Sequence, residues 1–148
     1  MPANECFAYY EPGTRITCKA TAAVTGKRLV TVTGNRTSGS FVVPVQANDT
    51  VEGGVYQVAH AVADGVVVGV AGWDAAINEL VPVIMDGVVP VTADAAIAFG
   101  VAVGSGALGK VKTAVGTTRV IGVAMTAASG VDVDAEIKLT LANINVGT

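Results

Sequence analysis

The clearest pattern along the chain is an alternation of apolar and polar residues. It is strongest in Arg28–Thr33, which runs into the turn sequence Gly34-Asn35, and in Glu136–Leu141 near the C-terminus. A period of two is typical of a strand that buries one face and exposes the other. These segments therefore predict two β-strands, the second with one face in water.

Two further apolar runs, 81–85 and 88–91, are separated by Asp86-Gly87. Asp-Gly favours the positive φ angles of a tight type I′ turn, so the two runs predict a β-hairpin. Pro82 and Pro90 have no N–H to donate to a neighbouring strand. Each should therefore lie at a sheet edge or with its nitrogen facing outward.

The composition also favours a mostly β fold. Valine, alanine and threonine dominate, whereas leucine is confined to positions 29, 80, 108, 139 and 141. Stiff β-branched side chains fit pleated sheets, and helices of globular proteins usually rely on leucine. We expect one small β domain of barrel-like or sandwich-like form, with at most short helical turns such as 73–77 and 92–99.

The chain is expected to divide into an extended N-terminal arm, residues 1–17, and a single β domain, residues 18–148, with a polar glycine-rich loop at 34–40. Within the domain, V-G-V-A at 68–71 and I-G-V-A at 121–124 resemble each other. A single recurrence is too little for a repeat array, which needs at least three units. It favours two similar strands of one sheet or barrel.

The chain carries little charge for a free domain. Of its 148 residues, 51% are hydrophobic and 14% charged, with a net charge of -3, whereas soluble domains average about 25% charged residues. The longest uncharged stretch is too short and too rich in glycine to cross a bilayer. Met1–Cys6 lacks the start of a signal peptide, so we expect synthesis in a cytoplasm and no membrane partner. The apolar excess indicates a surface that is buried against copies of the chain or a larger partner.

Candidate catalytic groups are sparse. The segment 104–110 contains G-x-x-x-x-G-K, but Val111 stands where a phosphate-binding loop needs Ser or Thr, which favours a glycine-rich turn between strands. His60 is the sole histidine, and Asp132 and Asp134 come with no sign of a shared pocket. We therefore expect no enzyme activity, no cofactor and no metal site.

The remaining polar side chains favour a structural role. Basic residues are scattered and the sequence pI is about 4.9, which disfavours a nucleic-acid partner. Cys6 and Cys18 have neither zinc-site nor redox spacing, and we expect both thiols to be reduced.

Several segments together resemble the capsid cement or decoration proteins of tailed bacteriophages. The resemblance spans residues 9–141 and consists of a rhythm of E-x-G, V-G-V-A and I-G-V-A elements. These elements lie in residues 10–17, 24–30, 68–71, 87–91, 120–124 and 127–132.

The resemblance implies a small β-barrel or β-tulip domain, often trimeric, that binds the outer surface of an expanded icosahedral shell. There it would bridge neighbouring capsomers and stabilise the shell against the pressure of packaged DNA. The implied partners are the major capsid protein of a tailed phage and other copies of the chain in a homotrimer. Phe7, Tyr9, Tyr10 and Arg15 are then the expected capsid contacts, because an extended arm can add a strand to a sheet edge or pack across a subunit seam.

Two other functions stay open. A β-rich adhesion or fibre module would bind a cell-surface glycan through Trp73 and the 34–40 loop, because a sugar can stack on the face of an aromatic ring. A phosphate-loop ATPase would depend on Lys110.

Overall fold

The computed structural model describes residues 14–36 and 55–145, which form ten β-strands and one short 3₁₀ helix. In chain order these are β1 (Arg15–Ala20), β2 (Leu29–Gly34), β3 (Tyr56–His60), β4 (Gly69–Ala71), β5 (Leu80–Ile84), β6 (Val88–Thr92), β7 (Ala102–Ser105), η1 (Ala107–Gly109), β8 (Val111–Thr113), β9 (Arg119–Ala124) and β10 (Asp134–Asn145). The mostly β prediction is confirmed. Within the described ranges, no helix is long and apolar enough to span a membrane.

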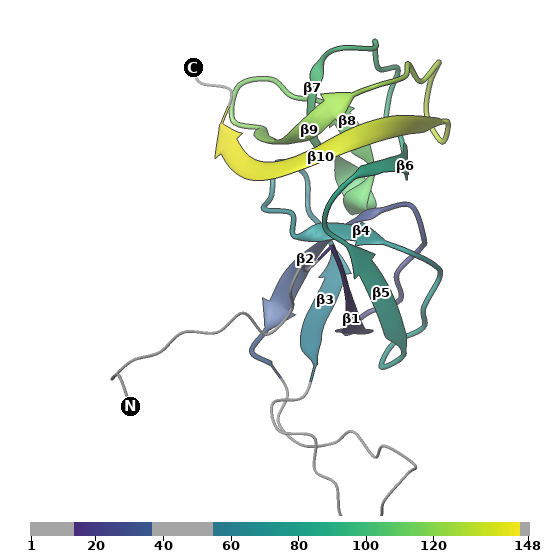
Figure 1. The fold of residues 1–148 in the computed structure, drawn as a ribbon, viewed down its shortest axis with the longest axis vertical. Helices are drawn as coiled ribbons and strands as arrows, with labels where there is room; N and C mark the ends of the chain where they lie inside the picture. Colours follow the sequence, from purple (N-terminus) through teal and green to yellow (C-terminus); the bar gives the residue numbers. More distant parts are fainter. Residues whose placement is uncertain (1–13, 37–54, 146–148) are drawn as a thin grey trace, which may run out of the picture.

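The strands form two lobes that lie one above the other (Figure 1). Lobe 1, formed by β1 to β5 within residues 15–36 and 55–84, is a closed barrel with the strand order β1-β3-β2-β4-β5. Lobe 2, residues 88–145, is a five-stranded sheet with the order β6-β10-β9-β7-β8. A parallel bridge between Ala93 and Val111 joins the end of β6 to the start of β8, so the sheet of lobe 2 curls toward the closed form of lobe 1.

The two lobes repeat one strand plan with the same pairing register. In lobe 1, β2 pairs with β3 and β4, and β5 pairs with β4 and β1. In lobe 2, β7 correspondingly pairs with β8 and β9, and β10 pairs with β9 and β6. Four residue pairs of lobe 1 match four of lobe 2. In lobe 1 they are Ala20–Val58, Val30–His60, Leu29–Val70 and Ile84–Val70, and in lobe 2, in the same order, they are Ala93–Val111, Val103–Thr113, Ala102–Val123 and Lys138–Val123. The chain is therefore an internal duplication of a five-stranded unit.

The hydrophobic cores repeat as well. Every buried residue of the lobe 1 core has a buried counterpart in lobe 2 at the matching strand position. In lobe 1 these residues are Cys18, Ala20, Val24, Val30, Val58, Ala71, Ala75, Val81 and Val83, and in lobe 2 they are Val91, Ala93, Ile97, Val103, Val111, Ala124, Ala128, Ala135 and Ile137. The expectation that 68–71 and 121–124 belong to one sheet is wrong, because β4 and β9 occupy the same place in different lobes.

The predicted hairpin at Asp86-Gly87 is also wrong. β5 pairs with β1 and β4, whereas β6 pairs with β10, so Asp86-Gly87 connects the two lobes. Gly87 has the expected positive φ of 99°, but the apolar faces of the two strands enter different cores. A type I′ turn needs a positive φ at Asp86 as well, which this residue lacks, so only the conformation of Gly87 was predicted correctly.

The two prolines differ in outcome. Pro90 lies on β6, the edge strand of lobe 2, as predicted. Pro82 lies on β5, which has a partner on each side. The Pro82 carbonyl accepts the N–H of Gly72 at 2.8 Å, one residue after the end of β4. Because proline has no N–H to donate back to Gly72, the pairing of β4 with β5 ends at this point.

The segments 73–77 and 92–99 contain no helix. Each crosses its lobe in extended or turn conformation and makes a single antiparallel bridge, Val24 with Ala75 and Ile97 with Ala128. The N–H groups of Ala75 and Ile97 donate to the carbonyls of Val24 and Ala128, which are distant in sequence, and not to carbonyls of the same segment as in a helix. β1 begins at Arg15, so residues 15–17 are part of the barrel and not of the arm.

Lobe 2 completes its hydrophobic core with side chains of lobe 1. Leu29, Ala61, Val67 and Val70 are buried in the same cluster as the interior of lobe 2, and Ile84 packs against that cluster. They face away from the lobe 1 core because successive residues of a strand point to opposite faces. We call these five residues the docking face of lobe 1.

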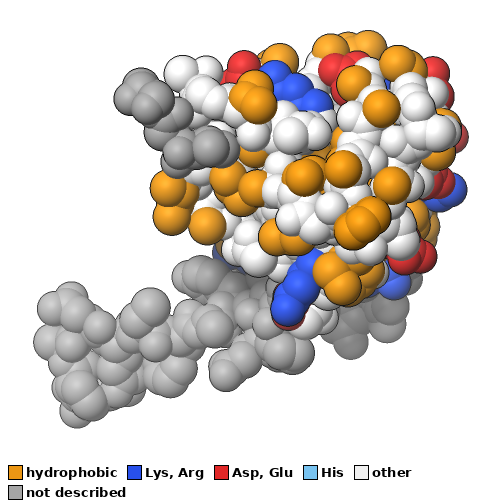
Figure 2. Space-filling model, turned by 90° about the horizontal axis from the view of Figure 1, so that it is seen from above, with side chains coloured by type: hydrophobic (Ala, Val, Ile, Leu, Met, Phe, Trp, Pro, Cys, Tyr) orange, Lys and Arg blue, Asp and Glu red, His pale blue; other side chains and the backbone are white. Residues whose placement is uncertain are grey.

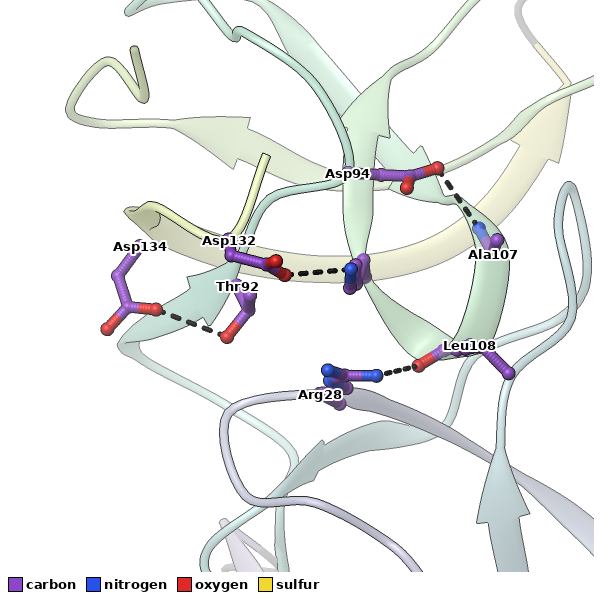
Figure 3. A network of polar contacts seen from close by, with 8 residues as sticks. Arg28, Thr92, Asp94, Ala107, Leu108, Asp132 and Asp134 are labelled. Carbon is purple, nitrogen blue, oxygen red and sulfur yellow. Dashed lines mark hydrogen bonds and ion pairs between the residues drawn. The ribbon is translucent and has the colours of Figure 1, made fainter. Parts of the chain in front are cut away.

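Polar contacts seal the rim of this junction, among them the hydrogen bond that Arg28 Nη1 donates to the Leu108 carbonyl at 3.3 Å (Figure 3). The carbonyl of Lys27 accepts the N–H of Thr92, and that of Ala61 accepts the N–H of Gly109, both at 2.9 Å. Lys27 Nζ lies 2.7 Å from Asp134 Oδ2, and the Thr92 hydroxyl donates to Asp134 Oδ1 at 3.2 Å. Backbone bonds of this kind fix the register of one lobe on the other.

A distortion of β10 provides a further contact. The pairing of β10 with β9 shifts register between Leu139 and Ile144, and Asn143 takes a positive φ of 53°. The Asn143 side chain then accepts the N–H of Val67 at 2.9 Å and donates to its carbonyl at 3.0 Å. An asparagine tolerates this backbone conformation better than most residues, so the bulge delivers an amide to the junction.

The junction predicts different effects for two glycines with positive φ. Gly109 has φ 72° and a Cβ there would collide with the Leu29 carbonyl across the junction, whereas Gly116 has φ 54° and open space. Gly116→Ala should lower the free energy of unfolding by about 1 kcal/mol, the cost of the left-handed backbone. Gly109→Ala should lower it by roughly 2–4 kcal/mol, because the steric cost adds to it. Equal losses in urea unfolding would contradict the close packing at Gly109.

A second prediction concerns acid. Asp64 of lobe 1 accepts the Thr118 hydroxyl at 2.6 Å and lies 2.9 Å from Lys112 Nζ. These two hydrogen bonds, with the charge of Lys112, hold the pKa of Asp64 below its usual range. Because the folded-state pKa is the lower one, this contribution to stability is present at neutral pH and is lost as the pH falls below about 4.

Asp64→Asn should therefore reduce stability at neutral pH and weaken its decline in acid, as measured by urea unfolding across that range. Glu136→Gln, on the exposed face of β10, is the matched control and should keep the wild-type pH profile. A profile of Asp64→Asn that runs parallel to wild type would show that this contact does not link stability to pH.

Candidate functional site

The glycine-rich segment 104–110 forms the turn between β7 and β8, as predicted. Asp94 Oδ2 accepts the N–H of Ala107 at 3.3 Å, and a Cβ on Gly106 would lie 2.6 Å from the same oxygen (Figure 3). The carboxylate of Asp94 thus lies against the backbone N–H groups of the turn, where a bound phosphate would need positive potential. Lys110 is engaged at 2.7 Å with Asp132. The turn is arranged as a structural element and not as an anion site.

His60 acts as a structural acceptor. Its Nε2 accepts the N–H of Thr25 at 2.8 Å, which places the proton on Nδ1 of the neutral ring. Burial, and then the positive charge of Arg28, lower the pKa of His60. The lone pair that a general base would use is therefore occupied by the backbone.

Asp132 and Asp134 are separated by their partners. Asp132 has a positive φ of 64° and pairs with Lys110, whose hydrogen bond and charge lower the pKa of the carboxyl. Asp134 pairs across the junction with Lys27. Each carboxylate neutralises a different lysine, so the two do not form an acid–base pair. Among the described residues, no group of three or more His, Cys, Asp or Glu side chains could hold a metal ion.

Cys18 is a buried thiol in the core of lobe 1 and is free, as predicted. Burial raises its pKa to about 11, so the reactive thiolate is scarce at neutral pH. Cys6 lies outside the described residues.

The predicted capsid contacts are only partly placed. Arg15 is exposed at the start of β1, opposite Ile84 on β5. Phe7, Tyr9 and Tyr10 lie outside the described residues. The structure therefore places only Arg15 among the four predicted contacts.

Trp73, the predicted stacking residue of the alternative glycan site, is 56% exposed on the connection between β4 and β5. Its indole N–H donates to the Leu80 carbonyl at 3.3 Å. Of the polar loop at 34–40, residues 37–40 lie outside the described ranges. Of the predicted glycan site, the structure thus places one exposed ring, whose polar edge is occupied.

Many large apolar side chains are exposed. The composition predicted that apolar surface exists, but it did not predict which residues form it. Phe99 is 75% exposed and Met125 53% exposed. The two segments run side by side, because the N–H of Gly100 donates to the Ala124 carbonyl at 2.7 Å. Viewed from above, the molecule presents groups of hydrophobic side chains with charged side chains among them (Figure 2). An alignment of the two lobes distinguishes these residues, because lobe 1 has glycine at both matching positions: Gly26 corresponds to Phe99 and Gly72 to Met125.

Comparisons with known proteins give a consistent result. A family model described as phage cement protein matches residues 10–139. The curated proteins contain no significant match to this chain. A solved structure of similar fold is the head fiber gp8.5 N base in bacteriophage phi29, with a TM-score of 0.63 and 19% sequence identity over 88% of this chain and 97% of that chain. At that identity the likeness concerns the fold alone. The family match covers most of the sequence, and the chain belongs to the phage cement protein family.

Proposed function

We propose that this phage structural protein binds the outer surface of an expanded capsid, bridges neighbouring capsomers and stabilises the shell against the pressure of packaged DNA. The observation that carries the proposal is the family match over residues 10–139. The major capsid protein of a tailed phage is the proposed partner, and a homotrimer is the proposed assembly. The chain would be made in the host cytoplasm and act on the outside of the virion.

The surface chemistry supports a role in assembly. Only 14% of the residues are charged, and large apolar side chains stand exposed on both lobes. Such surfaces on a small protein mark sites that are buried in contacts with other proteins. The candidate catalytic groups described above are engaged in structural contacts, which leaves the apolar surface as the outstanding feature.

The mechanism follows from linkage. A protein that binds the expanded shell and not its precursor or its dissociated subunits stabilises the expanded form by mass action. An oligomer that engages several capsomers at once gains further, because each later contact forms at a high effective concentration. Weak individual contacts are then sufficient for slow release.

Binding to the shell is tested by co-sedimentation of the purified protein with expanded shells of the phage that carries it. We expect saturable binding and a higher melting temperature of the decorated shells. At a free concentration of about 100 times the Kd, each occupied site contributes about 2.7 kcal/mol to the bound form. No co-sedimentation with expanded shells, or equal binding to unexpanded ones, would contradict the proposal.

The arm is tested by deletion of residues 1–12, which removes Phe7, Tyr9 and Tyr10 but leaves β1 intact. We expect at least a tenfold loss of shell affinity, about 1.4 kcal/mol, and a smaller loss for Arg15→Ala. Trp73→Ala is the matched control, because it removes an exposed aromatic side chain from lobe 1 and should bind shells normally. Full affinity of the deletion variant would remove the arm from the contact. Binding to a glycan array that is lost in Trp73→Ala would favour the glycan-binding alternative.

A further inference from the structure

The junction between the lobes is a contact between unlike surfaces. On one side is the docking face of lobe 1, formed by Leu29, Ala61, Val67, Val70 and Ile84. On the other is the end of lobe 2 that holds Thr92, Gly109 and Asp134. Because the lobes are copies of one unit, each lobe carries its own version of both surfaces. One version of each is used within the chain, and one version of each is left over.

The unused docking face lies on lobe 2. The shared register assigns its residues: Ala102 corresponds to Leu29, Val123 to Val70 and Lys138 to Ile84. His60 and Val70 are as far apart in the sequence as their counterparts Thr113 and Val123, so Ala114 corresponds to Ala61 and Val120 to Val67. We call these five residues the docking face of lobe 2: Ala102, Ala114, Val120, Val123 and Lys138.

Among the described residues, this second face keeps its apolar character at four of its five positions and is covered less than the first. Leu29, Ala61, Val67 and Val70 are at most 1% exposed. Their four counterparts are all apolar yet only half-buried, and Lys138 is exposed. Phe99 and Met125 extend the apolar surface beside it, at 75% and 53% exposure. A face that is apolar in both copies but covered in only one is the pattern expected of a contact that continues into another molecule.

The unused receiving surface lies on lobe 1. The counterparts of Thr92 and Asp134 are Lys19 and Leu80, which pair across β1 and β5 as their counterparts pair across β6 and β10. Leu80 is 36% exposed. The junction within the chain contains the ion pair of Lys27 with Asp134. In a contact between two copies, Gly100 of one copy would take the place of Lys27, and Leu80 of the other would take the place of Asp134. The repeated contact would therefore lack that ion pair and be more apolar.

We infer that copies of this chain associate head to tail, with the docking face of lobe 2 of one copy seated on the Lys19 and Leu80 end of lobe 1 of the next. Such a contact is heterologous, so it generates a ring if its rotation closes. The lobes then alternate around the assembly through similar contacts within and between chains. The inference gives a location to the self-association of the proposed function and does not depend on binding to a capsid.

Sedimentation velocity of the full-length protein, alone in solution, tests the inference. The wild type should sediment as an oligomer at tens of micromolar. Val123→Asp and Ala102→Glu should weaken self-association at least tenfold and shift the protein toward monomer. Both should fold, because Val123 lies opposite Lys138 across the strands, and the place of Ala102 is filled by a leucine in lobe 1.

Val131→Asp is the matched control. Its counterpart Ile77 is 60% exposed, so this position lies outside the junction, and Val131 itself is 59% exposed. The control should keep the wild-type oligomer, and circular dichroism should show native structure in all three variants. A monomeric wild type, or wild-type sedimentation of both Val123→Asp and Ala102→Glu, would overturn the inference. An intact oligomer that fails to bind shells would contradict the proposed function alone.

Discussion

The structure depends on one constraint: lobe 2 cannot close its hydrophobic core by itself. In lobe 1, β1 and β3 pair over three residues and close the barrel. In lobe 2 the corresponding strands meet only at the bridge of Ala93 with Val111. Apolar side chains of lobe 1, led by Leu29 and Val70, enter the lobe 2 cluster and complete it. Apolar burial at this junction therefore determines both the stability of lobe 2 and the relative placement of the lobes.

Local patterns predicted the strands well and the pairing of strands poorly. The alternation in 136–141 identifies the start of β10, where buried and exposed residues alternate. The alternation in 28–33 identifies β2, but there Leu29 and Val30 are both buried, on opposite faces of the strand. The hairpin at Asp86-Gly87 failed because the turn sequence contains no information about which core receives each flanking strand. The recurrence of V-G-V-A at 68–71 as I-G-V-A at 121–124 was the visible part of a complete duplication. The rest is hidden because matching core positions share apolar character and often differ in identity, as with Cys18 and Val91 or Val24 and Ile97 in the two cores.

For the functional surfaces, composition indicated that apolar surface exists and could not locate it. A low fraction of charged residues is a property of the whole chain, whereas exposure is decided by which strand face meets which neighbour. Val70 and Val123 illustrate the difference: they hold matching positions in β4 and β9, yet only Val70 is covered. The structural roles of His60 and Lys110 likewise depend on partners distant in sequence, Thr25 and Asp132.

A density map of the phage particle that carries this protein tests the account most directly. The account predicts density for the chain on the outer surface of the expanded shell, in assemblies where lobe 2 of each copy contacts lobe 1 of the next. Absence of the chain from the outer surface, or its presence there only as isolated copies, would contradict the account.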